Sequence, residues 1–157
     1  MVGGGSWVAF AYGKVDEELF VRMAECSALF PMMQFSALPW RKLSAPYASI
    51  CLKMAKLHEK MYEEIIRLVE NAEKTGEPIL RSMEYEYPHK GYEKIVDQFM
   101  MGDKYLVAPV LQKGVTFRKV TFPNGKWQDM NDGTIYSAGE HNVNAPIDVL
   151  PYFFKIS

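Results

Sequence analysis

The chain has 157 residues, of which 48% are hydrophobic and 24% are charged, and these proportions fit a folded globular protein rather than a disordered segment. Eighteen Lys and Arg residues against nineteen Asp and Glu residues give a formal net charge of −1, and the basic residues are scattered, so nucleic acid is not an expected partner. No run of about eighteen uncharged apolar residues occurs, so no membrane span is expected, and no feature of the sequence indicates a compartment.

The length also excludes a complete (β/α)8 barrel, which needs about 250 residues. Metal and cofactor sites are not expected either. Cys26 and Cys51 lack a second ligand at metal spacing, and the three histidines have no His or Glu partner at the spacings that bind zinc. The ten methionines are typical of adaptable core filler.

The first half of the chain has a helical pattern. Glycine-rich residues 1–13 suggest a strand end that opens into a loop. Acidic residues at positions 16–18 then suit the N-terminus of a helix that runs to about Leu29. Residues 30–35 (Phe-Pro-Met-Met-Gln-Phe) form a short apolar run that predicts a buried strand.

A second, longer helix is predicted over residues 49–74. Apolar side chains recur there at helical spacing, and Gly76 is placed to end the helix in the left-handed conformation. The order of loop, helix, buried strand, loop and helix is typical of a repeating β/α unit.

The second half has a strand-and-turn pattern from Glu77 onward, and we place the domain boundary near Arg81. Residues 79–87, 105–111, 115–122, 126–129, 134–136 and 147–154 are predicted strands, and residues 92–99 suggest one or two helical turns. Gly-containing turns at 123–125, 131–133 and 138–139 separate the later strands. A parity change in the apolar pattern hints at a bulge near Arg118 or Lys119. This spacing indicates an antiparallel β-sandwich or small barrel.

The most informative polar and aromatic residues follow the predicted strand at residues 30–35. In a β/α barrel the loop after a strand faces the active site, so Gln34, Ser36 and Trp40 are candidate substrate-binding residues. An indole stacks on the apolar face of a sugar ring, and an amide and a hydroxyl bind its hydroxyl groups. The alternative is that Trp40 only packs at the barrel mouth and Gln34 is a buried structural amide.

Several motifs together resemble glycoside hydrolase family 31. They are residues 76–83 (Gly-Glu-Pro-Ile-Leu-Arg-Ser-Met), 97–103 (Asp-Gln-Phe-Met-Met-Gly-Asp), 106–111 (Leu-Val-Ala-Pro-Val-Leu), 122–127 (Phe-Pro-Asn-Gly-Lys-Trp) and 145–147 (Ala-Pro-Ile). The resemblance implies an α+β fold, in which residues 1–81 are the last two β/α units of a catalytic (β/α)8 TIM barrel. Residues 82–157 would form the proximal C-terminal β-sandwich domain.

The resemblance also implies a function. Family members are retaining α-glycosidases that use two aspartates. The resemblance places both before residue 1, so no residue of this chain is expected to be catalytic and the chain alone is expected to be inactive. Where the common α-glucosidases of the family have Arg-x-His, this chain has Gln34, Phe35 and Ser36. That stretch is similar to an α-galactosidase-like branch, so glucose, galactose and xylose all stay open as the sugar.

Two other functions are compatible with the sequence. A carbohydrate-binding β module is suggested by Trp40 and Trp127, and a structural or oligomerisation domain without catalysis also remains open. Barrel units without their neighbours leave apolar surface exposed. The expected partners are therefore an α-linked oligosaccharide, bound by the parent enzyme, and a second copy of the chain. That second copy would bind through residues 30–35 and the helix face around Met54, Leu57 and Met61. The alternative is that the long helix docks onto the β-sandwich of the same chain.

Overall fold

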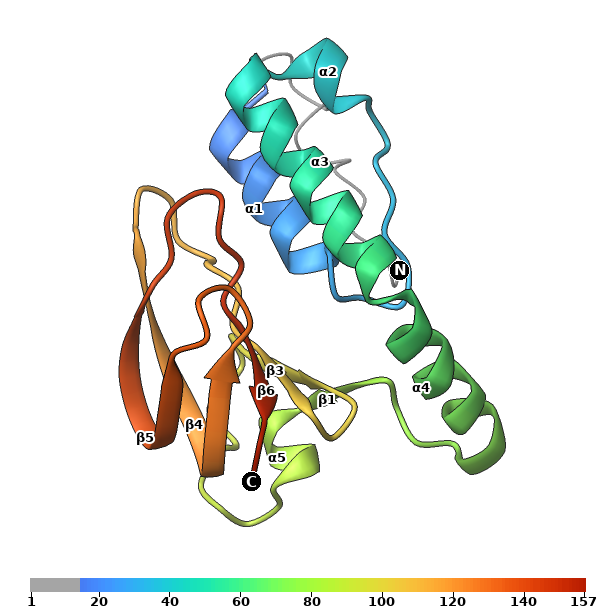
Figure 1. The fold of residues 1–157 in the computed structure, drawn as a ribbon, viewed down its shortest axis with the longest axis vertical. Helices are drawn as coiled ribbons and strands as arrows, with labels where there is room; N and C mark the ends of the chain where they lie inside the picture. Colours follow the sequence, from blue (N-terminus) through green and yellow to red (C-terminus); the bar gives the residue numbers. More distant parts are fainter. Residues whose placement is uncertain (1–14) are drawn as a thin grey trace. The chain divides into compact units, whose positions relative to one another are not determined.

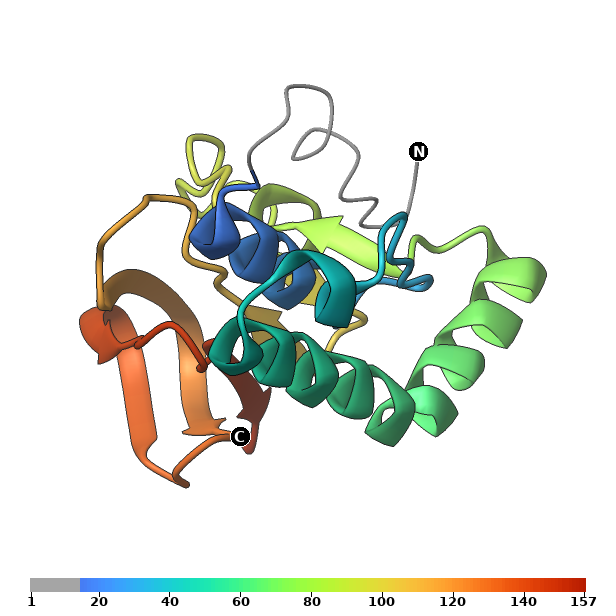
Figure 2. The same ribbon diagram turned by 90° about the horizontal axis from the view of Figure 1, so that it is seen from above.

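A computed structural model of the chain describes residues 15–157 (Figures 1 and 2). The chain divides into two compact units between Gly76 and Glu77. Arg81, near which the sequence predicts a boundary, lies in the first strand of the second unit. The division into a barrel part, 1–81, and a β-domain, 82–157, stays a prediction. The predicted strand end in residues 1–13 lies outside the described residues.

The first described helix, α1 (Glu17–Ser27), begins where the sequence predicts it. The side chain of Asp16 accepts a hydrogen bond from the backbone N–H of Leu19 at 3.1 Å and caps the helix, while Glu17 and Glu18 place negative charge at its positive end. The helix packs along α3 (Ala45–Lys60), and both ribbon views show the two side by side (Figures 1 and 2). This prediction is confirmed.

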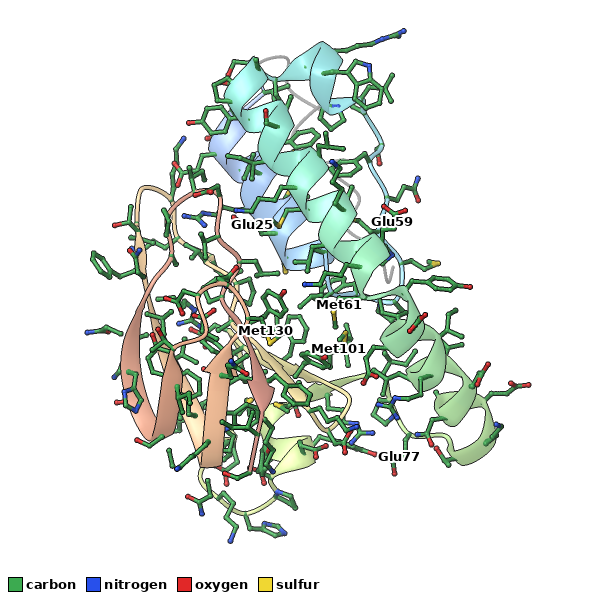
Figure 3. The ribbon with its side chains drawn as sticks, viewed as in Figure 1. Glu25, Glu59, Met61, Glu77, Met101 and Met130 are labelled. Atoms are coloured by element: carbon green, nitrogen blue, oxygen red, sulfur yellow. The ribbon has the colours of Figure 1, made fainter. Side chains whose placement is uncertain are left out.

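The long helix predicted over residues 49–74 is two helices, α3 and α4 (Tyr62–Thr75), and Met61 lies at their junction (Figure 3). Met61 has φ −89° and ψ 5°, and its N–H is shared between the carbonyls of Leu57 and His58. The pattern did not predict this break because the apolar period continues through it without a proline or glycine. Gly76 ends α4 in the left-handed conformation at φ 77°, as predicted.

The prediction of a strand over residues 30–35 is wrong for this chain, because the segment is irregular in the structure. Among residues 15–76 the structure has the helices α1, α2 (Pro39–Lys42), α3 and α4, and no strand. A strand requires a neighbour that supplies the other half of its hydrogen-bond ladder, and none is present in these residues. The apolar side chains pack instead, and the ring of Phe35 stacks on that of Phe20 with centroids 6.2 Å apart. The predicted β/α units are therefore not seen in this part of the chain.

The second unit contains one six-stranded antiparallel sheet with the order β1-β2-β3-β6-β4-β5. The strands are β1 (Leu80–Ser82), β2 (Phe99–Met101), β3 (Tyr105–Val107), β4 (Phe117–Asp129), β5 (Ile135–Asn144) and β6 (Tyr152–Lys155). The antiparallel prediction is confirmed. The second sheet of a sandwich is not among the described strands.

Two local predictions in this unit are wrong. The strand expected over residues 79–87 stops at Ser82, whose hydroxyl accepts a hydrogen bond from the N–H of Tyr85 and so caps a short helix, α5 (Met83–Glu86). The helical turns expected over residues 92–99 are absent, and the chain runs there as an irregular segment into β2. A serine hydroxyl that caps a helix gives the backbone an alternative to the hydrogen bonds of a strand ladder. The strand-like apolar pattern of residues 79–87 does not reveal this alternative.

Residues 123–125, predicted as a turn, form an irregularity inside the single long strand β4. The register with β5 shifts between Phe122 and Lys126, so the predicted bulge near Arg118 or Lys119 is also misplaced. Pro123 has no N–H to donate, and its carbonyl accepts a hydrogen bond from the Trp127 indole at 2.9 Å. Gly125 has φ 125°, and a Cβ there would collide with the carbonyl oxygen of Ser157. Only glycine fits this close backbone approach.

The core of the second unit is built from side chains that are almost fully buried. Phe122 is at its centre, stacked on Tyr136 at 4.9 Å and in an edge contact with Phe153 at 4.7 Å between ring centroids. The cluster consists of Met83, Met100, Leu106, Ala108, Val120, Phe122, Trp127, Val143 and Phe153. Trp127 is therefore core and is not available to a sugar.

Candidate functional site

The first unit contains a hollow of about 790 Å³ between the segment after α1 and the α2–α3 pair. Its wall from the segment and α2 includes Gln34, Leu38 and Trp40, and its wall from α3 includes Cys51 and Leu52. On α3 the lining positions Ala45, Ala48 and Ala55 carry small side chains. Small residues on one face of a helix leave room for the hollow, and this signal is present in the sequence although the apolar period does not reveal it.

Two of the three predicted substrate-binding residues line the hollow. Trp40 is 70% exposed, and Gln34 is also exposed. Ser36 is exposed but is not among the residues that line the hollow. Pro39 sets the position of the indole, because a proline is favoured in the first turn of a helix and fixes the start of α2 just before Trp40.

The described walls of the hollow carry no acid/base pair. They are mostly apolar, and the hydroxyl of Ser49 donates to the carbonyl of Ala45 at 2.9 Å within the helix. Burial, with Glu25 as a lesser cause, raises the pKa of the Cys51 thiol to about 12. A thiol with this pKa stays protonated at neutral pH and is not a nucleophile.

Three carboxylates elsewhere in the described residues have structural partners. Glu25 of α1 accepts a hydrogen bond from Arg22 at 2.9 Å, and both side chains are buried. Glu86 forms an ion pair with Arg81 at 2.6 Å. Burial raises the pKa of Asp129, but its carboxylate accepts hydrogen bonds from the backbone and side-chain N–H groups of Asn131 and thereby shapes the β4–β5 turn.

The motif at residues 97–103 has a structural role that the sequence did not reveal. Gln98 is 4% exposed, and its side-chain amide makes two hydrogen bonds to the backbone of one residue of β4. The amide nitrogen donates to the Thr121 carbonyl at 2.7 Å, and the amide oxygen accepts from the Thr121 N–H at 3.0 Å. The preceding residue, Asp97, forms an ion pair with Arg118 at 2.8 Å. The motif therefore attaches the segment before β2 to β4.

Among residues 15–157 there is no group of three or more His, Cys, Asp and Glu side chains that could hold a metal ion. No helix in the same residues is long and apolar enough to cross a bilayer.

Comparison with known proteins identifies the family. The family model described as "Glycosyl hydrolase family 31 C-terminal domain" matches residues 76–156. Myogenesis-regulating glycosidase of Mus musculus is 36% identical over 135 residues, which cover 82% of this chain and 19% of that protein. Alpha-glucosidase 2 of Bacillus thermoamyloliquefaciens is 30% identical over 119 residues, which cover 74% of this chain and 15% of that protein.

A solved structure gives the same result. The glycoside hydrolase family 31 dextranase of Flavobacterium johnsoniae, complexed with glucose, has a TM-score of 0.82 and 32% identity, with 88% of this chain and 18% of that chain covered. The chain belongs to glycoside hydrolase family 31, as its motifs predict. It spans less than a fifth of the length of these two relatives, and of the dextranase chain as well.

Proposed function

We propose that this chain is the C-terminal portion of a retaining α-glycosidase that hydrolyses the glycosidic bonds of α-linked oligosaccharides. The names of the relatives support this activity, since they are a glycosidase, an α-glucosidase and a dextranase with bound glucose. In this proposal the nucleophile and the acid/base aspartates belong to a part of the enzyme outside these 157 residues. The single observation that carries the proposal is the family match over residues 76–156.

Residues 1–81 are proposed as the last two β/α units of a (β/α)8 barrel, and residues 82–157 as its companion β-domain. The helices α1, α3 and α4 would lie outside the barrel, and the segment at residues 30–35 would be its last strand. That segment pairs with no strand in the described residues. The proposal therefore requires this segment to become a strand when neighbouring barrel strands supply its ladder, which the described residues do not show.

The hollow beside Trp40 is proposed as part of the sugar-binding wall. Trp40 would stack on the apolar face of a sugar ring, Gln34 would bind ring hydroxyls, and Ser36 would join them at the end of the strand. The chain has Gln34, Phe35 and Ser36 where the common α-glucosidases of the family have Arg-x-His. The proposal therefore leaves glucose, galactose and xylose as candidate sugars.

An activity assay tests the proposal. The 157-residue chain and the enzyme that contains it are each assayed with nitrophenyl α-glucoside, α-galactoside and α-xyloside. We expect turnover by the whole enzyme and none by the chain, because the described residues offer no pair of carboxylates at the hollow. Turnover by the chain alone would contradict the proposed role.

A variant tests the binding wall. Trp40→Ala in the whole enzyme is expected to raise KM about five- to thirtyfold, since stacking of a sugar on an aromatic ring contributes on the order of 1–2 kcal/mol. Tyr62→Ala is the matched control, because Tyr62 is an exposed aromatic residue of α4 that does not line the hollow. Equal effects of the two variants would exclude Trp40 from the binding wall.

A further inference from the structure

A second, smaller hollow lies in the β-sheet unit at the beginning of β4. Its volume is about 340 Å³. It is bordered by the loop between β3 and β4, by the first residues of β4 and by β5. The lining side chains that could contact a ligand or fix the walls are Leu111, Gln112, Phe117, Asn142, Asp97 and Arg118. All of them belong to the second unit, and the hollow is distinct from the one beside Trp40.

Apolar surface on this hollow is exposed. The phenyl ring of Phe117 is 64% exposed and Leu111 is 65% exposed, although both line the hollow. Phe117 is the first residue of β4, and its backbone pairs with Asn144 of β5. This pairing fixes the position of the Phe117 Cα at the edge of the hollow. An exposed aromatic ring at a hollow offers a flat apolar face to a ligand.

Polar groups with spare bonding capacity lie beside this apolar surface. Asn142 stands opposite Lys119 in the β4–β5 ladder, and Gln112 comes from the loop before β4. Both are exposed, and neither side chain makes a hydrogen bond to another of residues 15–157. Each amide can donate two hydrogen bonds and accept two, which suits the hydroxyl groups of a sugar.

The charges at the hollow are already compensated. Arg118 forms an ion pair with Asp97 at 2.8 Å, and it also donates to the carbonyls of Asp97, Pro109 and Lys119. The Lys119 ammonium lies 2.7 Å from a carboxylate oxygen of Glu140. With its cations paired, the hollow has little attraction for an anion, so its chemistry favours a neutral ligand. The contacts of Arg118 also hold the walls in place before a ligand binds.

We propose that this hollow is a second, non-catalytic saccharide-binding site that takes a neutral α-linked oligosaccharide. Phe117 and Leu111 contact the apolar face of a sugar ring, and Gln112 and Asn142 bind its hydroxyl groups. The choice of an α-linked sugar rests on the proposed function. The site itself does not depend on Trp40, and it would give the second unit a sugar-binding surface that does not use the buried Trp127.

The test is an NMR titration of the 157-residue chain, labelled with nitrogen-15, with isomaltotriose at millimolar concentrations. We expect shifts of the backbone amides in residues 110–119 and at Asn142. Phe117→Ala is expected to weaken this binding at least about tenfold. Ile135→Ala is the matched control, because Ile135 is an exposed apolar residue of β5 that does not line the hollow, and it is expected to leave the binding unchanged.

The outcomes separate this site from the one beside Trp40. Trp40→Ala is expected to leave the shifts in residues 110–119 intact. If the unsubstituted chain shows these shifts but the whole enzyme hydrolyses none of the three nitrophenyl glycosides, the proposed function fails and the second site stands. The second site is overturned if these amides do not shift, or if Phe117→Ala has no more effect than Ile135→Ala. It is also overturned if inorganic phosphate produces the same shifts at lower concentration, because the site would then bind anions.

Discussion

Gln98 takes the place of a neighbouring strand along the first half of β4. That half pairs with β5 on one side only, since β6 contacts β4 at Trp127–Asp129, and the amide of Gln98 binds the Thr121 N–H and carbonyl at the open side. We expect Gln98→Met to destabilise the β-sheet unit, because methionine has a similar size and cannot make either hydrogen bond. The substitution therefore tests the hydrogen bonds with little change in packing.

The magnitude follows from the number of groups left without a partner. A buried donor or acceptor that loses its partner costs about 1–3 kcal/mol. Two such groups are lost at Thr121, which is half-buried and therefore partly reached by water. We expect a loss of about 2–4 kcal/mol in the free energy of unfolding, a large part of the roughly 5–15 kcal/mol that holds a typical domain together.

Urea unfolding followed by circular dichroism measures this loss, and hydrogen exchange at the Thr121 amide measures it at one site. Gln112→Met is the control, because Gln112 is exposed and makes no hydrogen bond to other residues of the range 15–157. The control is expected to change the stability by less than about 0.5 kcal/mol. If Gln98→Met costs no more than Gln112→Met, or if the Thr121 amide exchanges no faster, the strand-like role of Gln98 is refuted.

Three other predictions concern stability, its dependence on pH, and assembly. Gly125→Ala is expected to lower the free energy of unfolding in urea by about 1–3 kcal/mol more than Gly139→Ala does. Both glycines have positive φ, but only at Gly125 would a Cβ meet the carbonyl of Ser157. Equal losses in the two variants would contradict this close approach. Burial raises the pKa of Cys51 from 9.0 to about 12, so the thiol loses its proton at lower pH in the unfolded chain than in the folded chain. The free energy of unfolding should therefore fall as the pH rises between these two values. If the stability of a Cys51→Ala variant falls as steeply over this range, Cys51 is not the cause. The chain is expected to self-associate at micromolar concentration through residues 30–35, where Met32 is 62% exposed. Light scattering should show a smaller mass for Met32→Lys than for the unsubstituted chain, and a monomeric unsubstituted chain would contradict the prediction.

The surface proposed for self-association is narrower than the sequence suggested. Met54 and Met61 were expected to lie on an exposed helix face, but both are buried in the structure. Their burial corrects the prediction for these two residues. The periodic pattern marks which residues share one side of a helix, but it does not say whether that side is covered.

Residues of the family motifs differ in what they do. The motif at 122–127 contains the irregularity of β4, in which Trp127 donates to the carbonyl of Pro123 and Gly125 makes room for the backbone of Ser157. The motif at 97–103 contributes Gln98 as a substitute strand. These residues maintain the β-sheet unit, so their resemblance to a glycosidase family identifies the fold of this part and says little about the substrate.

Local chemistry was enough to predict the features that depend on a few neighbouring residues. Asp16 caps α1 through a hydrogen bond to the third residue after it, and Gly76 ends α4 because the left-handed conformation needs no Cβ. The turn at residues 131–133 and the antiparallel character of the second unit also follow from local sequence. Trp40 is exposed just after Pro39 and lines the hollow together with Gln34, while their role in binding a sugar stays a proposal.

Only the tertiary structure decided the features that depend on distant partners. Residues 30–35 are apolar enough for a strand, but no strand in the described residues completes their ladder. Residues 123–125 have the composition of a turn, yet β5 and β6 pair with the chain beyond them and keep it in one strand. Composition and spacing set what each segment can form by itself. Backbone hydrogen bonding between segments far apart in the chain determines which of those forms is adopted, because a strand is stable only when its partner is in place.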